Sequence, residues 1–189
     1  MAHQHVCPWW LGHFHTIPIR RLVEKPERIV GSHLAEGMTA LDVGCGMGFF
    51  TLPMAQMVGT TGKVIAVDIQ PKMLSGLRRR VTKAGLVDRV VVHPCEASSL
   101  KLDEYGGAID FGLAFAVVHE VPDREVFFAE LGPALAPHGR LLVVEPSGRV
   151  TVADFGDTLA AAAGKGFTVV DRPMIRGKTD RSALLARRA

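Results

Sequence analysis

The sequence has few cysteines and few aromatic residues, and it has no long run of apolar side chains. Its three cysteines, Cys7, Cys45 and Cys95, are few and odd in number, so we expect a reduced, cytoplasmic protein rather than a disulfide scaffold. No apolar run reaches the length of a membrane span, and the start lacks the cationic and apolar regions of a secretory signal. Neither an anchor nor a leader is therefore expected.

The chain also lacks a strong charge of one sign, with a formal net charge of +3 over 189 residues. Arginines gather at 78–80 and 187–188, and the first group is expected to form the solvated face of a helix. No broad basic stripe with interleaved aromatic side chains is present, so no nucleic-acid partner is expected. The hydrophobic content of 48% and charged content of 22% are typical of one globular domain with a substantial core.

Two common phosphate-binding patterns are absent as well. No Gly-x-x-x-x-Gly-Lys-Ser/Thr loop occurs. A dinucleotide turn reads Gly-x-Gly-x-x-Gly, and its third glycine lets the helix pack closely. Here the glycines fall at 44, 46 and 48, and the bulky Phe49 stands where the third dinucleotide glycine would be. This spacing argues against a nicotinamide-dependent oxidoreductase, which we keep as an alternative.

What the sequence does hold is a buried strand, a glycine turn and a helix start within residues 40–50. Gly44, Gly46 and Gly48 would let a ligand approach bare backbone at the carboxyl end of the strand. A second β-branched run, at 64–67, is followed by Asp68, whose carboxylate suits two ribose hydroxyls. Together these features predict the nucleoside-binding half of a doubly wound α/β fold.

Strands alternate with helices along the rest of the chain, which predicts parallel pairing in a three-layer α/β sandwich. Thr151 and Asp154 have the spacing of a capping box at a helix start. The last two strands have no helical pattern between them, so they must pair antiparallel. The expected strands are 39–43, 64–68, 90–93, 109–115, 140–145, 167–171 and 182–187, and the expected helices are 26–34, one that holds 52–58, 71–84, 122–135 and 151–163.

The pattern Asp-x-Gly-x-Gly-x-Gly, from Asp42 to Gly48, followed by an acidic strand end, resembles motifs I and II of the class I S-adenosylmethionine-dependent methyltransferases. Residues 115–123, after the fourth strand, resemble the small-molecule branch that includes the ubiquinone/menaquinone methyltransferases. The resemblance covers residues 26–189. It implies a seven-stranded, mainly parallel, Rossmann-like sheet of order 3-2-1-4-5-7-6 with a C-terminal antiparallel hairpin.

The resemblance also implies which residues hold the cofactor. Asp42, beneath the turn, would order the loop or meet the methionine ammonium group, and Asp68 with Ile69 would hold the ribose and cover the adenine. Glu96 matches a position that meets the adenine amino group, and the alternative for it is an exposed loop glutamate. The complete set expected for S-adenosyl-L-methionine is Asp42, Gly44, Cys45, Gly46, Gly48, Asp68, Ile69, Met73, Glu96, Ala97 and Phe115.

On the acceptor side, His119 is the best titratable candidate, because an imidazole can accept a proton near neutral pH. The alternative is that His119 and Glu120 only cap or brace the next helix, which we favour for Glu120. Glu145, after the fifth strand, would orient the acceptor or satisfy loop amides. We expect His119 and Glu145 to be the catalytic residues.

The start of the chain carries both tryptophans, Trp9 and Trp10, with His13 close by. A tryptophan face stabilises a sulfonium cation and excludes water. In the family the segment before motif I commonly forms a lid, so residues 1–25 are expected to build a lid and acceptor pocket for the domain at 26–189. Trp9, Trp10, His13 and His119 are the expected substrate-binding residues.

The histidines and Cys7 near the start raise the alternative of a metal site. Their spacings do not match a structural zinc pattern, and we expect no metal. Arsenite methyltransferases share the fold but hold the metalloid with several cysteines, and only Cys7 and Cys95 could serve here, which argues against arsenite.

The function expected from these features is transfer of a methyl group to a diffusible small molecule by in-line displacement. A second alternative is a non-catalytic module that binds S-adenosylmethionine without turnover. The sequence leaves a homodimer open.

Overall fold

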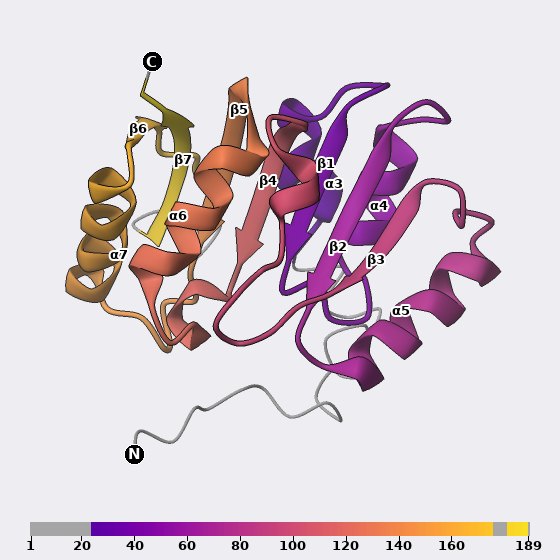
Figure 1. Ribbon diagram of the computed structural model, residues 1–189, viewed down its shortest axis with the longest axis horizontal. Coiled ribbons are helices and arrows are strands. Elements are labelled where there is room, and N and C mark those ends of the chain that lie inside the picture. Colours follow the sequence, from indigo (N-terminus) through magenta and orange to yellow (C-terminus); the bar gives the residue numbers. More distant parts are fainter. Residues whose placement is uncertain (1–23, 176–180, 189) are drawn as a thin grey trace. The chain divides into compact units, whose positions relative to one another are not determined.

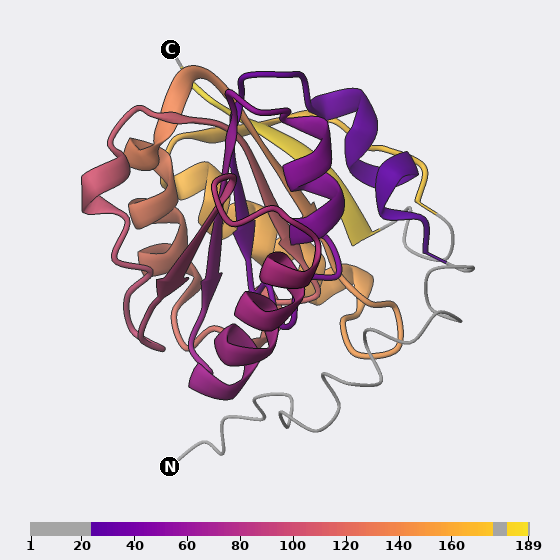
Figure 2. The same ribbon diagram turned by 90° about the vertical axis from the view of Figure 1, so that its right-hand side faces the viewer.

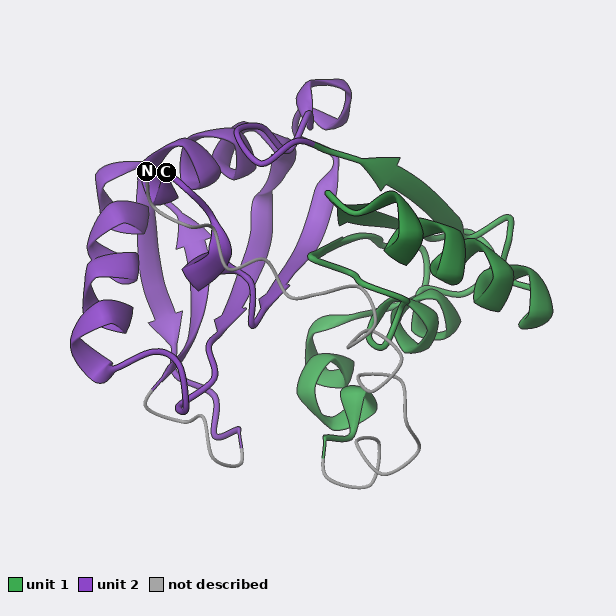
Figure 3. Cartoon of the chain, turned by 90° about the horizontal axis from the view of Figure 1, so that it is seen from below, with its two compact units in different colours: residues 1–95 green, residues 96–189 purple. Residues whose placement is uncertain are grey.

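The computed structural model describes residues 24–175 and 181–188. The chain divides into two compact units, residues 1–95 and 96–189, which are coloured green and purple in Figure 3. We describe each unit by itself. Trp9, Trp10 and His13, the predicted pocket residues near the start, lie outside the described residues. No helix in the described ranges is both long enough and apolar enough to cross a membrane.

The first unit contains three parallel strands in the order β3-β2-β1 (Figure 1). One helix connects β1 to β2 and a second helix connects β2 to β3, and each connection leads to the next strand on the same side. Because such connections are right-handed, both helices lie on the same face of the three strands. The elements are α3 (Pro26–Val30), η1 (Gly31–His33), β1 (Thr39–Val43), α4 (Thr51–Met57), β2 (Lys63–Asp68), α5 (Pro71–Lys83) and β3 (Val90–Pro94).

β1 and β2 are buried along nearly their whole length, because both consist largely of small and β-branched apolar residues. Leu41 pairs with Ile65, and Asp42 pairs with Ala66 one residue further on. This register carries the chain to the carboxyl ends of both strands at the same level. The predicted glycine turn and Asp68 therefore meet at one edge.

The second unit contains four strands in the order β4-β5-β7-β6. β4 and β5 are parallel, whereas β7 lies between β5 and β6 and is antiparallel to both. Two views place α6 along one face of these strands (Figures 1 and 2), and α7 contacts α6 and β6. The elements are η2 (Asp103–Tyr105), β4 (Ile109–Phe115), η3 (Val118–Glu120), α6 (Arg124–Ala134), β5 (Leu135–Val144), α7 (Val152–Gly164), β6 (Phe167–Asp171) and β7 (Ser182–Arg187).

The predicted fold class is confirmed: seven strands lie in the described ranges, they are mainly parallel, and the last two form the antiparallel hairpin. Three element boundaries differ from the predicted ones by two residues or more. The first helix ends at Val30 and continues as a short 3-10 turn, and α6 begins at Arg124 because the carboxylate of Asp123 caps it. The fifth strand begins at Leu135 rather than 140, with a register shift opposite β4 that accommodates residues 136–139.

Candidate functional sites

The glycine turn, residues 44–48, is fastened to the end of β2 by backbone hydrogen bonds. The amides of Gly44 and Cys45 donate to the carbonyl oxygen of Val67 at 2.9 and 3.0 Å. All three glycines have positive φ angles, 70° at Gly44, 53° at Gly46 and 83° at Gly48. Other residues adopt this left-handed conformation at a cost, so the local backbone explains the glycine spacing.

The second and third glycines of the turn serve different purposes. A Cβ atom at Gly48 would lie 2.5 Å from Leu77 Cδ1 and 2.6 Å from Leu52 Cδ1, so this glycine is required for packing against the helices. A Cβ at Gly46 would meet nothing within 4 Å. The backbone at Gly46 therefore borders open space, which a ligand can occupy.

The carboxylate of Asp68 connects the end of β2 to the turn. Its Oδ2 atom accepts the amide of Gly46 at 2.9 Å, and its Oδ1 atom accepts the amide of Gln70 at 2.8 Å. Burial raises the pKa of Asp68 above its ordinary value, although these amide hydrogen bonds oppose the rise. Each carboxylate oxygen can accept a further hydrogen bond, so Asp68 remains able to receive hydroxyl donors.

Asp42 lies beneath the turn and is only 3% exposed. The hydroxyl of Thr51 donates to its Oδ2 atom at 2.6 Å, which joins the end of β1 to the first turn of α4. Burial raises the pKa of Asp42 from 3.8 to about 6. Both predicted roles of Asp42, ordering the loop or meeting the methionine ammonium group, stay predictions. Thr51 was not anticipated, and its only sequence signal is a hydroxyl within an otherwise apolar helix start.

Three other predicted cofactor residues of this unit differ in exposure. Cys45 and Met73 are buried, at 5% and 4%, and burial raises the pKa of the Cys45 thiol well above its usual range. Ile69 is 37% exposed and offers apolar surface directly after Asp68.

Arg80, predicted to lie on a solvated face, is half-buried and donates to the carbonyl oxygen of Met47 in the turn. No local sequence pattern reveals that contact.

In the second unit, the segment after β4 turns sharply. Phe115 is buried, and Ala116 has a φ of 56°, a left-handed conformation that is unusual for a residue with a side chain. The amide of Ala116 donates to the carbonyl oxygen of Val144 at 2.7 Å, which holds this conformation beside the end of β5. Strain of this kind often occurs at functional segments, and here it directs the chain into η3.

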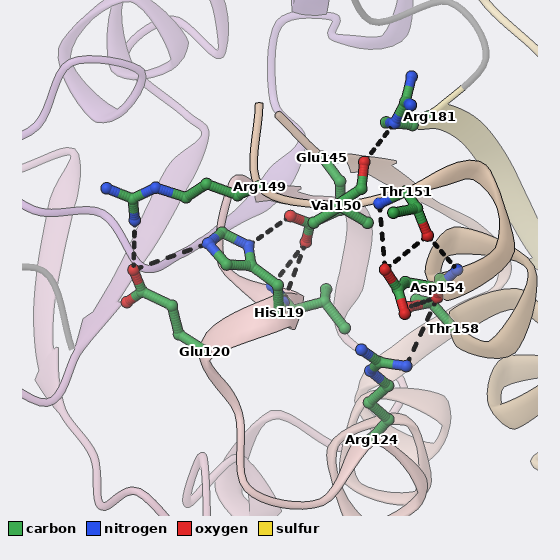
Figure 4. Close-up of polar contacts among 11 residues, drawn as sticks. His119, Glu120, Arg124, Glu145, Arg149, Val150, Thr151, Asp154, Thr158 and Arg181 are labelled. Carbon is green, nitrogen blue, oxygen red and sulfur yellow. Dashed lines mark hydrogen bonds and ion pairs between the residues drawn. The ribbon is translucent and has the colours of Figure 1, made fainter. Parts of the chain in front are cut away.

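His119 in η3 and Glu145 at the end of β5 form a close pair (Figure 4). The Nδ1 atom of His119 lies 2.5 Å from Glu145 Oε2. The other carboxylate oxygen, Oε1, accepts the amides of Val118 at 2.8 Å and of His119 at 3.3 Å. Glu145 is only 1% exposed, so a buried carboxylate holds both the backbone and the ring of His119.

The opposite ring nitrogen, Nε2, faces Glu120, which in turn pairs with Arg149. It is buried and has no hydrogen-bond partner among the described residues. Glu120 Oε1 lies 3.8 Å from Nε2 and 3.5 Å from Arg149 Nη1 (Figure 4). We call these four residues, His119, Glu120, Glu145 and Arg149, the histidine cluster. Arg149 was not anticipated from the sequence, and Glu120 braces the cluster, whereas Asp123 caps the next helix.

Glu96 and Ala97, which begin the second unit, are exposed. The carboxylate of Glu96 forms an ion pair with Lys101, and its backbone pairs with Ser99. The contact of Glu96 with an adenine group stays a prediction. Within residues 24–175 and 181–188, no group of three or more His, Cys, Asp or Glu side chains could hold a metal ion.

Comparison with known proteins gives consistent results. A family model described as a methyltransferase domain matches residues 34–170. The ubiquinone/menaquinone biosynthesis C-methyltransferase UbiE of Francisella tularensis subsp. novicida is 35% identical over 124 residues, which are 64% of this chain and 48% of that protein. A demethylmenaquinone methyltransferase of Oceanobacillus iheyensis is 30% identical over 111 residues, 59% of this chain and 45% of that protein. The chain thus spans about half the length of these curated relatives.

Among the solved structures that match nearly the whole chain is one of a methyltransferase. A SAM-dependent methyltransferase from Aquifex aeolicus superimposes with a TM-score of 0.82 and 26% sequence identity. The match covers 95% of this chain and 97% of that protein. Both the fold and the length of the chain are therefore close to those of that structure.

Proposed function

The chain belongs to the methyltransferase domain family, whose model covers residues 34–170, and from this premise we propose that it transfers a methyl group from S-adenosylmethionine to a small-molecule acceptor. The observation that carries the proposal is the open backbone at Gly46 beside the carboxylate of Asp68. The named activities of the relatives and of the Aquifex structure support the same reaction.

The residues of the first unit fit the chemistry of this cofactor. The turn offers backbone without side chains at Gly46, where the amino acid part and the ribose need close approach. Asp68 offers carboxylate oxygens for ribose hydroxyls, and Ile69 offers an exposed apolar side chain for the adenine. The turn lacks the third dinucleotide glycine, which agrees with a cofactor without a pyrophosphate.

S-adenosylmethionine supplies a methyl group on a positively charged sulfur, which is a good leaving group. The protein then contributes mainly alignment and exclusion of water, which together can lower a barrier by about 7 kcal/mol or more. In this proposal the residues of the glycine turn orient the cofactor, and His119 acts on the acceptor.

The features that support the methyltransferase argue against the nicotinamide alternative, because Phe49 occupies the position of the third dinucleotide glycine. Nothing in the family match or in the similar structures points to an oxidoreductase. A cytoplasmic location, a homodimer and the absence of a nucleic-acid partner stay predictions.

The test is calorimetric titration of the full chain with S-adenosylmethionine, S-adenosylhomocysteine and NADH. We expect micromolar binding of the first two, at least tenfold weaker binding by Asp68→Ala, and no binding of NADH. Asp88→Ala is the matched control, because Asp88 is an exposed acidic residue of the same unit. Binding of NADH alone would overturn the proposal. Binding of S-adenosylmethionine without transfer to any acceptor in a metabolite extract would favour the non-catalytic module.

A further inference from the structure

The histidine cluster contains a buried ring nitrogen, Nε2 of His119, that has no hydrogen-bond partner among the described residues. We infer that Glu145 fixes His119 with the lone pair of Nε2 unoccupied, so that the acceptor is a nucleophile that loses a proton during transfer. This inference rests on the proposed function. It assigns His119 as the base and Glu145 as a positioning residue that acts through His119.

The contacts of Glu145 determine which ring nitrogen carries the proton. A carboxylate only accepts hydrogen bonds, so the 2.5 Å contact with Nδ1 requires the hydrogen to lie on Nδ1. A neutral imidazole has one protonated nitrogen, and Nε2 is then the acceptor. The amides of Val118 and His119 hold the other carboxylate oxygen, so Glu145 cannot turn away without losing them.

The surroundings of Nε2 suit a nitrogen that gains a proton. Buried polar atoms in proteins nearly always have a hydrogen-bond partner, whereas Nε2 has none among the described residues. Two carboxylates lie beside the ring, that of Glu145 directly after β5 and that of Glu120 in η3, and Arg149 pairs with Glu120. When Nε2 takes a proton, a carboxylate lies on the side of each ring nitrogen, Glu145 at Nδ1 and Glu120 at Nε2.

For a hydroxyl, thiol or carbon acid, the acceptor's proton moves to Nε2, and the freed electron pair forms the bond to the methyl carbon. A primary or secondary amine attacks with its own lone pair and then gives its N–H proton to Nε2. The pair of the broken carbon–sulfur bond stays on sulfur, which loses its positive charge. A tertiary amine or a thioether has no such proton and would leave the base without a role. The structure therefore favours an acceptor whose nucleophilic atom carries a proton to lose: a hydroxyl, a thiol, a primary or secondary amine, or a carbon acid.

The first test is nitrogen NMR of the labelled full chain without any ligand, with His119 assigned from a His119→Asn variant. We expect the wild-type ring to be protonated at Nδ1. In Glu145→Gln, the side-chain carbonyl can keep the two backbone amides while the new NH2 donates to Nδ1, which moves the proton to Nε2. Glu130→Gln is the control, because Glu130 also holds a loop amide, that of Leu100. A wild-type ring protonated at Nε2 would overturn the inference whatever the enzyme methylates.

The second test measures transfer of a labelled methyl group to acceptors in a metabolite extract, followed by identification of the product. We expect ethers, thioethers, methylamines or C-methyl products. Glu145→Gln should reduce kcat about 10²–10⁴-fold and abolish the acid limb of the pH–rate profile, with S-adenosylmethionine affinity unchanged. Sulfonium or quaternary ammonium products, or undiminished transfer by Glu145→Gln, would refute the acceptor class. If the wild-type protein does not bind S-adenosylmethionine, the proposed function itself is refuted.

Discussion

At the scale of single residues, two buried carboxyl groups shape the glycine turn. Asp42 bonds to Thr51 at the start of α4, and Asp68 bonds to the amide of Gly46. Their like charges raise the pKa of Asp42 further, in addition to the larger effect of burial. The chain therefore keeps two acidic groups close together, where removal of their protons costs stability.

Replacement of Asp42 by asparagine should change how stability depends on pH. The pKa of Asp42 is raised from 3.8 to about 6 in the folded protein. Its contribution to the free energy of unfolding is therefore fully present below pH 3.8 and is lost as the pH rises through about 6. The loss is on the order of 3 kcal/mol. Asp42→Asn should retain the Thr51 contact, and its free energy of unfolding should fall less over this range in urea titrations.

Asp68→Asn is the comparison for that experiment, because the pKa of Asp68 is raised in the same direction by burial. If wild type and Asp42→Asn show the same slope of unfolding free energy against pH, Asp42 titrates in the folded protein as it does in the unfolded chain, and its pKa is not raised.

Alanine at Gly48 and at Gly46 should have different effects. At Gly48 the new methyl group would collide with Leu77 and Leu52 in addition to the strain of a φ of 83°, so we expect a loss of about 2–4 kcal/mol of stability. At Gly46 the space is open, so the loss should be about 1 kcal/mol, whereas S-adenosylmethionine affinity should fall at least tenfold. Thermal unfolding and calorimetry measure the two effects. Full affinity in Gly46→Ala would place the ligand away from this backbone.

The sequence predicts the turn well because all its determinants are local. Three glycines and a strand pattern suffice to place it, and Asp68 follows from the next strand. The pairing of His119 with Glu145, 26 residues away, depends on how β4 and β5 align. Residue types suggested both as candidates, but only the fold shows that one holds the other. Arg149 has no local signal at all.

At the scale of elements, the start of α7 has the predicted capping box. The hydroxyl of Thr151 accepts the amide of Asp154 at 3.1 Å, and the Asp154 carboxylate accepts the amide of Thr151 at 3.1 Å (Figure 4). Thr151→Ala should cost about 1 kcal/mol of stability, because the amides of the first turn lose an acceptor. Thr151→Ser keeps the oxygen and is the control in urea unfolding. Equal losses in both variants would indicate that the methyl group of Thr151, not its oxygen, matters.

Strand positions were predicted more closely than helix starts and bulges. β1, β4, β6 and β7 have the predicted bounds, because each is a short β-branched or apolar run between clear turns. β5 was predicted too short because Pro137 and Gly139 indicate a turn, whereas the strand continues through them with a register shift. At Gly139 the carbonyl oxygen of Ile109 would lie 2.6 Å from a Cβ, a close approach that no local pattern reveals.

At the scale of the whole molecule, the family match covers residues 34–170 and leaves the start of the chain outside it. The start nevertheless carries both tryptophans and several histidines, an unusual concentration for a chain with 6% aromatic residues. The features for cofactor binding, namely the glycine turn and Asp68, all follow residue 40. Cofactor binding and acceptor binding are therefore expected to be separable along the chain.

Removal of residues 1–16 tests this separation. The affinity for S-adenosylmethionine should stay within about twofold of that of the full chain, because the residues proposed to bind the cofactor are retained. If the aromatic segment builds the acceptor pocket, transfer to the acceptor should fall at least 10²-fold. Trp9→Ala with Trp10→Ala in the full chain distinguishes loss of the indole rings from loss of chain length. Transfer that is unchanged in both proteins would exclude an acceptor pocket at the start of the chain, and the apolar surface for the acceptor would then have to come from residues after 16.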